Sequence, residues 1–288
     1  MKKVLVCILN YYQEDYVVDL IMNILEKSPQ TSFYFSIGDI QPCNNFLYDK
    51  LINIKEDRFK YSYTSFNYNP GYAKGNNELI KHASKDNHFE YILISNPDIE
   101  VKDYNIINKM IADLEANENY AVVGPKVVEV NGRQAGPYLK QTPYIYGLKH
   151  LFPVAWAPFW FIREGRIKKI SKVTSVWRII GAFFLIKHDY FNKIGYFDEN
   201  TFLYWEEDIL SSNLQKLGKK TLYDPTIEVV HLNNGKGTKK ISEYSINSMN
   251  YYFKLCNYSR FSIIFCNTCI KFYNKILHVK GNILSRED

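Results

Sequence analysis

The sequence contains three adjacent acidic residues and, further along the chain, a histidine. Side chains of these types can accept or donate a proton in a reaction. Three acids, Glu206-Glu207-Asp208, follow the aromatic run 202–205 and open a predicted helix. Carboxylates in the first turn of a helix complement its dipole, which is the purely structural explanation. A carboxylate beside aromatic surface also has a raised proton affinity, which suits a general base. The residues alone leave both explanations open.

Further polar residues come directly after predicted strands. They are Asn10-Tyr11, Asp39 and Asn96-Pro97-Asp98. Ligands bind outside the carboxyl ends of strands in open α/β sheets, so we expect these side chains to meet at one edge of a sheet. Each group taken singly is also typical of a turn or a helix cap.

Two glycine-containing segments are candidates for ligand contact. In Asn69–Asn77, glycines let the backbone approach a ligand and asparagines offer donors and acceptors, although a connection into the next helix explains the segment equally. It matches neither the dinucleotide fingerprint nor the Walker loop. His231 ends a predicted strand and precedes the polar segment 233–237. A role beside phosphate or metal and a simple packed or surface histidine both fit that position.

Apolar runs alternate with amphipathic segments over most of the chain. Strands are predicted at 4–9, 33–37, 59–64, 91–94, 121–123, 221–223 and 228–231, and helices at 16–25, 78–83, 104–116 and from Glu207 to Gly218. An apolar run at 173–187 is interrupted by Gly181. The alternation predicts an α/β fold with a mostly parallel central sheet flanked by helices. We interpret 140–172, which is basic and aromatic, as an insertion or lid, and the tail from 241 as helical.

The composition is that of an ordinary globular chain, with 46% hydrophobic and 23% charged residues over 288 positions. These proportions exclude a disordered or low-complexity protein. The net charge of +6 is unevenly spread, because 140–172 holds seven Lys or Arg against one Glu and 233–288 holds nine against three acids. Two basic segments on an acidic body indicate anionic partners for those segments and fit general nucleic-acid binding poorly.

Five cysteines, an odd number, exclude a disulfide scaffold. Cys266 and Cys269 have no second pair and no neighbouring histidine, so we interpret them as small residues of an apolar helix. The apolar run 4–9 is too short for a signal peptide, and no stretch reaches the roughly 20 apolar residues of a spanning helix. We expect a cytoplasmic protein that also lies on the inner face of the cell membrane if its basic segments bind lipid.

Taken together, the motifs resemble family 2 glycosyltransferases of the GT-A fold, in the bacterial rhamnosyltransferase-like branch. The matching pieces occur in the family's order. They are Val6–Tyr11, Gly38-Asp39, Asn69–Asn77, Ser95–Asp98, Gly181–Ile186, Ile194–Glu199, Phe202–Asp208 and His231. The resemblance implies a GT-A glycosyltransferase domain over 1–240, with a Rossmann-like nucleotide-binding half, followed by a basic amphipathic helical tail over 241–288.

The resemblance also implies a donor site for a nucleotide-diphosphate sugar. Asn10, Tyr11 and Asp39 would hold the base and ribose, and Lys74 and Asn76 would lie near the diphosphate. Asn96-Pro97-Asp98 stands where the family has an Asp-x-Asp motif, so Asp98 would bind Mn²⁺ or Mg²⁺. Asn96 departs from the first Asp of that motif. His231 matches the late histidine that approaches the metal or the diphosphate.

The family's catalytic Glu-Asp pair falls within the three acids. If Leu210 marks the helix face, Glu207 is the base, whereas the literal Glu-Asp dipeptide would make it Asp208; we favour Glu207. The implied acceptor side contains Gly181, Ala182 and Trp205. One base and one displacement invert the anomeric centre, with no covalent sugar–enzyme intermediate.

The expected partners are a nucleotide-diphosphate sugar and a glycan or lipid-linked acceptor, in the synthesis of capsule, lipopolysaccharide or another surface polysaccharide. The basic segments 140–172 and 241–288 would contact an anionic membrane, although a tail helix packed on the body fits the sequence equally. Nucleic acid is not an expected partner. The alternatives are a non-catalytic nucleotide-sugar or glycan-binding protein of the same fold and a nucleotidyltransferase.

Overall fold

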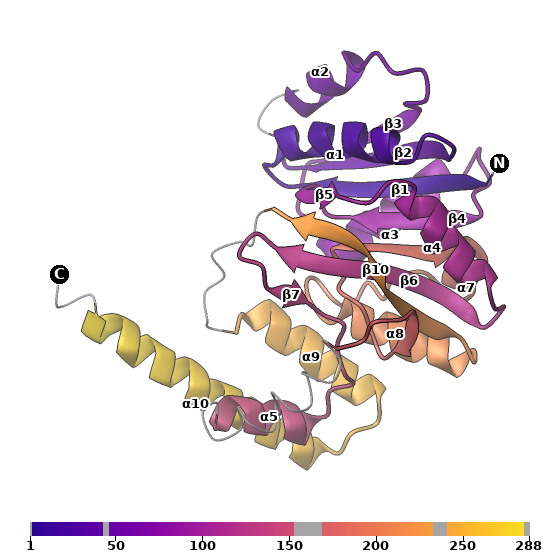
Figure 1. Ribbon diagram of the computed structural model, residues 1–288. Helices are drawn as coiled ribbons and strands as arrows, with labels where there is room; N and C mark the ends of the chain where they lie inside the picture. The colour runs from indigo at the N-terminus through magenta and orange to yellow at the C-terminus, as the bar shows by residue number, and fades with distance from the viewer. Residues whose placement is uncertain (1, 43–45, 153–168, 233–240, 285–288) are drawn as a thin grey trace.

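The computed structural model describes residues 2–42, 46–152, 169–232 and 241–284, and Figure 1 shows the arrangement of its elements. Parts of three predicted features lie outside these residues: 153–168 of the predicted lid, 233–237 after His231, and the last residues of the tail. The described chain forms one large sheet with helices on both faces and a group of helices at one end of it.

The first half of the chain alternates strands and helices. Its elements are β1 (Lys3–Asn10), α1 (Glu14–Lys27), β2 (Ser32–Ile40), α2 (Phe46–Ile52), β3 (Tyr61–Phe66), α3 (Tyr72–Ala83), β4 (Tyr91–Ser95), β5 (Ile99–Val101), α4 (Ile106–Glu115), β6 (Tyr120–Glu129) and β7 (Gln134–Ala135). Strands β3, β2, β1 and β4 lie in that order and pair in parallel. This half is parallel, as the alternating sequence pattern predicts, and it is the Rossmann-like half that the resemblance implies.

The second half completes a mixed sheet. Its elements are α5 (Pro143–Leu151), β8 (Thr174–Val176), β9 (Phe183–Lys187), α7 (His188–Lys193), α8 (Glu206–Lys216), β10 (Lys220–His231), α9 (Glu243–Leu255) and α10 (Arg260–Leu284). Strand β9 lies between β4 and β6 and is antiparallel to both, whereas β6 and β10 are parallel. The short β5 pairs antiparallel with β10 at the edge.

Strand β1 shows why the sheet carries helices on both faces. Successive side chains of a strand point to opposite faces. Val4, Val6 and Ile8 therefore join one buried cluster with α1 and α4, while Leu5 and Cys7 join another with α3 and α8. An apolar run buried on both faces is typical of a central parallel strand, as the sequence predicts for 4–9.

Several boundaries differ from the sequence prediction. Helix α3 begins at Tyr72, not near Glu78, because Gly71 adopts φ +76° and lets the chain turn directly into a helix. The two strands predicted at 221–223 and 228–231 are one strand, β10, with an irregularity between Asp224 and Glu228. β5 and β7 have only three and two residues, too few for a periodic pattern.

Helices α9 and α10 pack on the body of the protein. Met249, Tyr252 and Phe253 of α9 and Ile270 of α10 are fully buried in a cluster that also contains Trp205, the residue before α8. Figure 1 shows α5 lying beside α10 below the sheet, and α10 continuing away from the body toward the C-terminus. The packed arrangement that the sequence left open is therefore present on one side of these helices.

This packing predicts a stability difference between two isoleucines of α10. Ile270→Ala should lower the free energy of unfolding by about 2–5 kcal/mol, because it empties buried volume. Ile276→Ala, at a 39% exposed position, should change it by no more than about 0.5 kcal/mol. Urea unfolding of the two variants is the measurement, and equal midpoints would mean that α10 does not unfold together with the body.

Candidate active site

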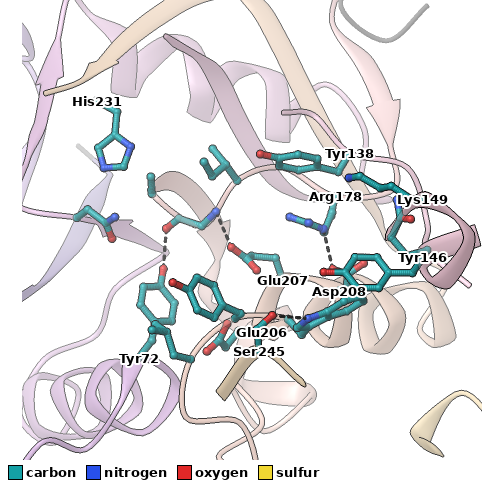
Figure 2. A pocket seen from close by; sticks show the side chains of 18 residues that line it. Tyr72, Tyr138, Tyr146, Lys149, Arg178, Glu206, Glu207, Asp208, His231 and Ser245 are labelled. Atoms are coloured by element: carbon teal, nitrogen blue, oxygen red, sulfur yellow. Dashed lines mark hydrogen bonds and ion pairs between the residues drawn. The ribbon is translucent and has the colours of Figure 1, made fainter. Parts of the chain in front are cut away.

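A pocket of about 530 Å³ opens at the carboxyl end of the sheet. Helices α3, α5 and α9 and the start of α8 contribute to its lining. The rest of the lining includes the segment after β4, the β8–β9 connection and the end of β10. Figure 2 shows His231 at one end, Tyr146 and Lys149 at the other, and Glu207 between them. The predicted acids and the predicted histidine, far apart in sequence, therefore meet in one cavity.

The carboxylate of Glu207 faces the pocket and is held by a backbone amide. The Gly181 N–H donates to Glu207 Oε1 at 2.8 Å, and the Tyr72 hydroxyl donates to the Gly181 carbonyl at 2.6 Å. A Cβ at position 181 would collide with Glu207 Oε1, so a larger residue there would displace the carboxylate from this position. Ala182, the next residue, also lines the pocket. Its carbonyl accepts a hydrogen bond from the Asn96 N–H at 2.8 Å.

Asp208 is buried and both its oxygens have partners. Trp177 Nε1 donates to Oδ1 at 2.8 Å, and Arg178 Nε lies 2.7 Å from Oδ2. Burial raises the pKa of Asp208, and the positive charge of Arg178 opposes that shift. The Arg178 guanidinium also lies 4.1 Å over the Tyr138 ring. Asp208 thus anchors the β8–β9 connection to α8, and its carboxylate is committed to that role.

Glu206 is the third acid, and its surroundings favour the protonated form. It is only 4% exposed, and among the described residues its Oε1 has no hydrogen-bond partner. Burial, followed by the negative charge of Glu207, raises its pKa from 4.5 to about 8. At neutral pH the raised pKa therefore favours a protonated Glu206 directly before Glu207 in the chain.

The entry into α8 is strained and held by aromatic packing. Tyr204 and Trp205 both adopt φ +71°, the left-handed region that large residues rarely occupy. The Trp205 ring stacks on Tyr252 of α9 at 5.5 Å and meets Tyr146 of α5 edge-on at 5.1 Å. Helices α5 and α9 therefore hold the turn that presents the three acids to the pocket.

Asp98 and His231 form the pair at the other end of the site. His231 Nε2 lies 3.1 Å from Asp98 Oδ1, because the antiparallel register of β10 on β5 places His231 opposite Ile99. The Leu232 N–H also donates to the Asp98 carbonyl at 2.8 Å. Asp98 is buried, and His231 and Asn96 line the pocket.

This pair is the part of the structure to compare with the predicted metal site. In the part of the chain that the structure describes, no group of three or more His, Cys, Asp or Glu side chains could hold a metal ion. Mg²⁺ in phosphate-binding enzymes is typically held by one or two carboxylates, with substrate phosphates and water completing its shell. Asp98, with His231 beside it, fits an ion of this kind, for which the protein supplies only one or two ligands.

The residues predicted to hold the nucleotide lie at the carboxyl ends of β1 and β2. Asn10 Nδ2 donates to Asp39 Oδ1 at 2.8 Å, and the Tyr63 hydroxyl donates to Asp39 Oδ2 at 2.8 Å. Burial raises the pKa of Asp39, and these two hydrogen bonds oppose the shift. Tyr11 is 49% exposed, and its ring lies 4.5 Å from that of Tyr12. The structure thus brings Asn10 and Asp39 together and leaves the neighbouring Tyr11 side chain half exposed.

Two predicted residues of α3 do not line the pocket. Asn76 is buried, and its amide donates to the Tyr72 carbonyl of its own helix at 2.9 Å. Lys74 lies 3.8 Å from Glu78, with its ammonium 5.2 Å from the centre of the Tyr68 ring. Of the predicted acceptor-side residues, Gly181, Ala182 and Trp205 all line the pocket.

Sequence reasoning missed Tyr63 and Arg178. Tyr63 lies in the strand predicted at 59–64, where nothing in the local pattern links it to Asp39. Arg178 interrupts the apolar run 173–187, and a charged residue in such a run is a signal for a buried pair. That signal could have linked Arg178 to one of the three acids.

Comparisons with known proteins find similarity to glycosyltransferases. No family model matches the chain. The hexosyltransferase Agl10 of low-salt glycan biosynthesis in Haloferax volcanii is 25% identical over 139 residues, or 48% of this chain and 41% of its own length. N-acetylglucosaminyl-diphospho-decaprenol L-rhamnosyltransferase of Mycobacterium tuberculosis is 25% identical over 150 residues, or 49% of this chain and 47% of its own length. The chain thus spans about half the length of these curated relatives.

A solved structure shows the fold. GalNAc-T7, crystallised with UDP, GalNAc and Mn²⁺, superposes with a TM-score of 0.58 over 87% of this chain and 47% of that chain, at 14% identity. The chain has the GT-A fold, and its curated relatives are glycosyltransferases. The resemblance predicted from the motifs is confirmed at that level.

The burial of Glu206 predicts a pH-dependent stability. Its pKa is raised in the folded state, so between about pH 4.5 and 8 the folded chain keeps a proton that the unfolded chain releases. The free energy of unfolding therefore falls as pH rises through that window. Glu206→Gln removes this loss, so its melting temperature should exceed that of the wild type by a few degrees at pH 9 and by much less at pH 5.

Glu26→Gln, at an exposed glutamate of α1, is the control for loss of a negative charge. Thermal unfolding of the three proteins at pH 5, 7 and 9 makes the comparison. A Glu206→Gln advantage that stays constant from pH 5 to 9 would contradict a protonated Glu206.

Proposed function

We propose that the chain is an inverting family 2 glycosyltransferase that acts in the synthesis of a bacterial surface polysaccharide such as capsule or lipopolysaccharide. It would move a hexose-type sugar from a nucleotide-diphosphate sugar to a hydroxyl of a glycan or lipid-linked acceptor. The observation that carries the proposal is the pocket with Glu207 between two ends, one marked by His231 beside Asp98 and the other by aromatic side chains.

The donor end would lie at the carboxyl ends of β1, β2 and β4. Tyr11 would cover the base, and the buried Asn10–Asp39 pair would bind the ribose, since its partners already orient the Asp39 carboxylate. Asp98 and His231 would hold a divalent cation, Mn²⁺ or Mg²⁺, whose chemistry is to neutralise the charge that grows on a departing diphosphate. That Lys74 lies near the diphosphate stays a prediction, since its ammonium contacts Glu78 and the Tyr68 ring in this structure.

Glu207 would take the proton of the acceptor hydroxyl. Among the three acids, Asp208 is committed to Trp177 and Arg178, and Glu206 is buried in a form that already carries a proton. Glu207 alone combines a place in the pocket lining with a single backbone donor that fixes its direction. The acceptor oxygen would attack the anomeric carbon from the Glu207 side as the bond to the diphosphate breaks, which inverts the centre.

The acceptor would occupy the end of the pocket beside α5. Tyr138, Tyr146 and Trp205 present aromatic surface there, and Gly181 and Ala182 form the wall between the acceptor and Asn96. Aromatic side chains with a few polar groups are typical of small-molecule sites, and their faces suit the C–H surface of a sugar ring. The donor and acceptor ends would therefore meet at the Glu207 carboxylate.

The base assignment predicts a selective loss of turnover. Glu207→Gln should lower the transfer rate by about 10²–10⁴-fold, because the amide cannot take the proton. Nucleotide binding should remain, since a glutamine oxygen can still accept from the Gly181 N–H. Nucleotide release from a panel of nucleotide sugars, with Mn²⁺ and without an added acceptor, measures turnover as slow hydrolysis, and Glu26→Gln is the charge control.

Wild-type turnover by the Glu207 variant would return the role of base to Asp208 or Glu206. Nucleotide binding by the wild type without hydrolysis or transfer to any acceptor would instead favour the non-catalytic binding protein. Release of pyrophosphate from a nucleoside triphosphate would favour a nucleotidyltransferase.

The metal assignment predicts a binding defect. Wild-type protein should gain several degrees in melting temperature when a matching nucleoside diphosphate and Mn²⁺ are both added, because ligands of the folded state stabilise it. Asp98→Ala should lose most of the Mn²⁺-dependent part of that gain. Asp103→Ala, at the partly exposed carboxylate that accepts from the Glu228 N–H, is the control for acid removal nearby. An undiminished Mn²⁺ response in the Asp98 variant would exclude Asp98 as the metal ligand.

A further inference from the structure

Helix α10 has a second face whose large apolar side chains are exposed in the part of the chain that the structure describes. Ile263, Cys266 and Ile270 are buried against α5 and α9. On the opposite side the large apolar side chains recur every three, four or eight residues. They are Phe261 (84% exposed), Ile264 (52%), Phe272 (50%) and Ile276 (39%). That spacing places them in one stripe along the helix.

The stripe has positive charge beside it. Arg260, Lys271 and Lys275 are exposed on the same helix, at positions between or next to the exposed apolar residues. Residues 244–286 contain six Lys or Arg and no Asp or Glu. A helix with an exposed apolar stripe flanked only by cations is typical of helices that lie in the interface of an anionic bilayer.

Helix α5 extends this surface. Tyr144 is 53% and Phe152 52% exposed, and the Tyr144 ring lies 5.6 Å from that of Phe265 on α10. The backbones approach closely at Gly147, where a Cβ would lie 3.1 Å from the Cys266 Cα. The two helices thus present one patch, which we call the α5–α10 patch: Tyr144, Phe261, Ile264, Phe272 and Ile276.

We infer that the α5–α10 patch docks on the surface of an anionic membrane. Its apolar side chains enter the boundary between headgroups and acyl chains, and Arg260, Lys271 and Lys275 contact lipid phosphates. None of the helices in the described ranges is both long and apolar enough to cross a bilayer. Charge favours lipid over a second copy of the chain, because two copies meeting at this patch would bring their cations together without an acid of 244–286 between them.

The patch has a fixed relation to the pocket. Helix α5 carries the exposed Tyr144 next to Phe265 of α10 and places Tyr146 and Lys149 on the pocket lining. Docking would therefore hold the aromatic end of the pocket close to the bilayer. If the proposed function is correct, that end receives a lipid-linked acceptor. The docking itself rests only on the patch and is tested without any measurement of transfer.

Vesicle sedimentation tests the inference directly. The full chain should bind vesicles of phosphatidylcholine with about 30% phosphatidylglycerol, bind pure phosphatidylcholine more weakly, and lose affinity as salt rises. The double substitution Phe261→Ser/Phe272→Ser should weaken binding at least roughly tenfold, because it removes two interfacial aromatic rings. Phe46→Ser, on α2 at the far end of the molecule, is the matched control, with a phenylalanine that is 54% exposed.

A double lysine substitution measures the electrostatic contribution to vesicle binding separately. Lys271→Gln/Lys275→Gln should reduce binding to anionic vesicles roughly tenfold and leave binding to pure phosphatidylcholine unchanged. The exposed lysines Lys55 and Lys85, changed together to Gln, keep the same net charge as this variant and should lose far less. Melting temperatures and nucleotide binding, measured in every variant, report on the fold and on the proposed donor site independently of the membrane.

Three results would overturn the inference. The first is a folded wild-type chain that does not sediment with anionic vesicles. The second is a Phe261/Phe272 variant that binds them as the wild type does. The third is a wild-type dimer that these substitutions convert to a monomer without any vesicle binding, which would assign the patch to a second copy. In each case nucleotide binding and hydrolysis would still decide the proposed function separately.

Discussion

The hydrogen bond from the Gly181 N–H to the Glu207 carboxylate is the contact on which the pocket depends. Glycine at 181 leaves room for it, because a Cβ there would displace the carboxylate oxygen of Glu207 from its present position. The Tyr72 hydroxyl holds the other side of the same residue through its carbonyl. One glycine thus joins α3, the strand β9 that follows it and the start of α8, and it gives the acid a single direction.

The order of strands explains how the two ends of the site come together. Strand β9 is inserted antiparallel between β4 and β6, which places Ala182 against Asn96 at the end of β4. Strand β10 pairs antiparallel with β5, which places His231 beside Asp98. Both pairings involve residues far apart in the chain. The sheet therefore creates the site through register, and side chains from helices α3, α5 and α8, from the end of β10 and from the β8–β9 connection line it.

The C-terminal helices take part in the site as well as in the stability of the chain. A left-handed conformation at Tyr204 and Trp205 costs energy, and packing of the Trp205 ring against Tyr146 and Tyr252 offsets that cost. Buried acids next to this turn add a further cost, which the Arg178–Asp208 pair reduces. Helix α10 completes the support with one face and leaves the other for the α5–α10 patch.

The sequence by itself determined the first strands and helices, because apolar periodicity is a local property: the run 4–9 is a strand buried on both faces, and 16–25 is a helix packed by one face. The order of the motifs also predicted the GT-A fold. Only the tertiary structure distinguished Glu206, Glu207 and Asp208. Neighbouring residues on a helix point about 100° apart, and what each acid meets is supplied by Gly181, Arg178 and the surrounding burial, none of which is adjacent in the chain. The pairing of Asp98 with His231 and the contact of Tyr63 with Asp39 depend likewise on strand register, which no local pattern encodes.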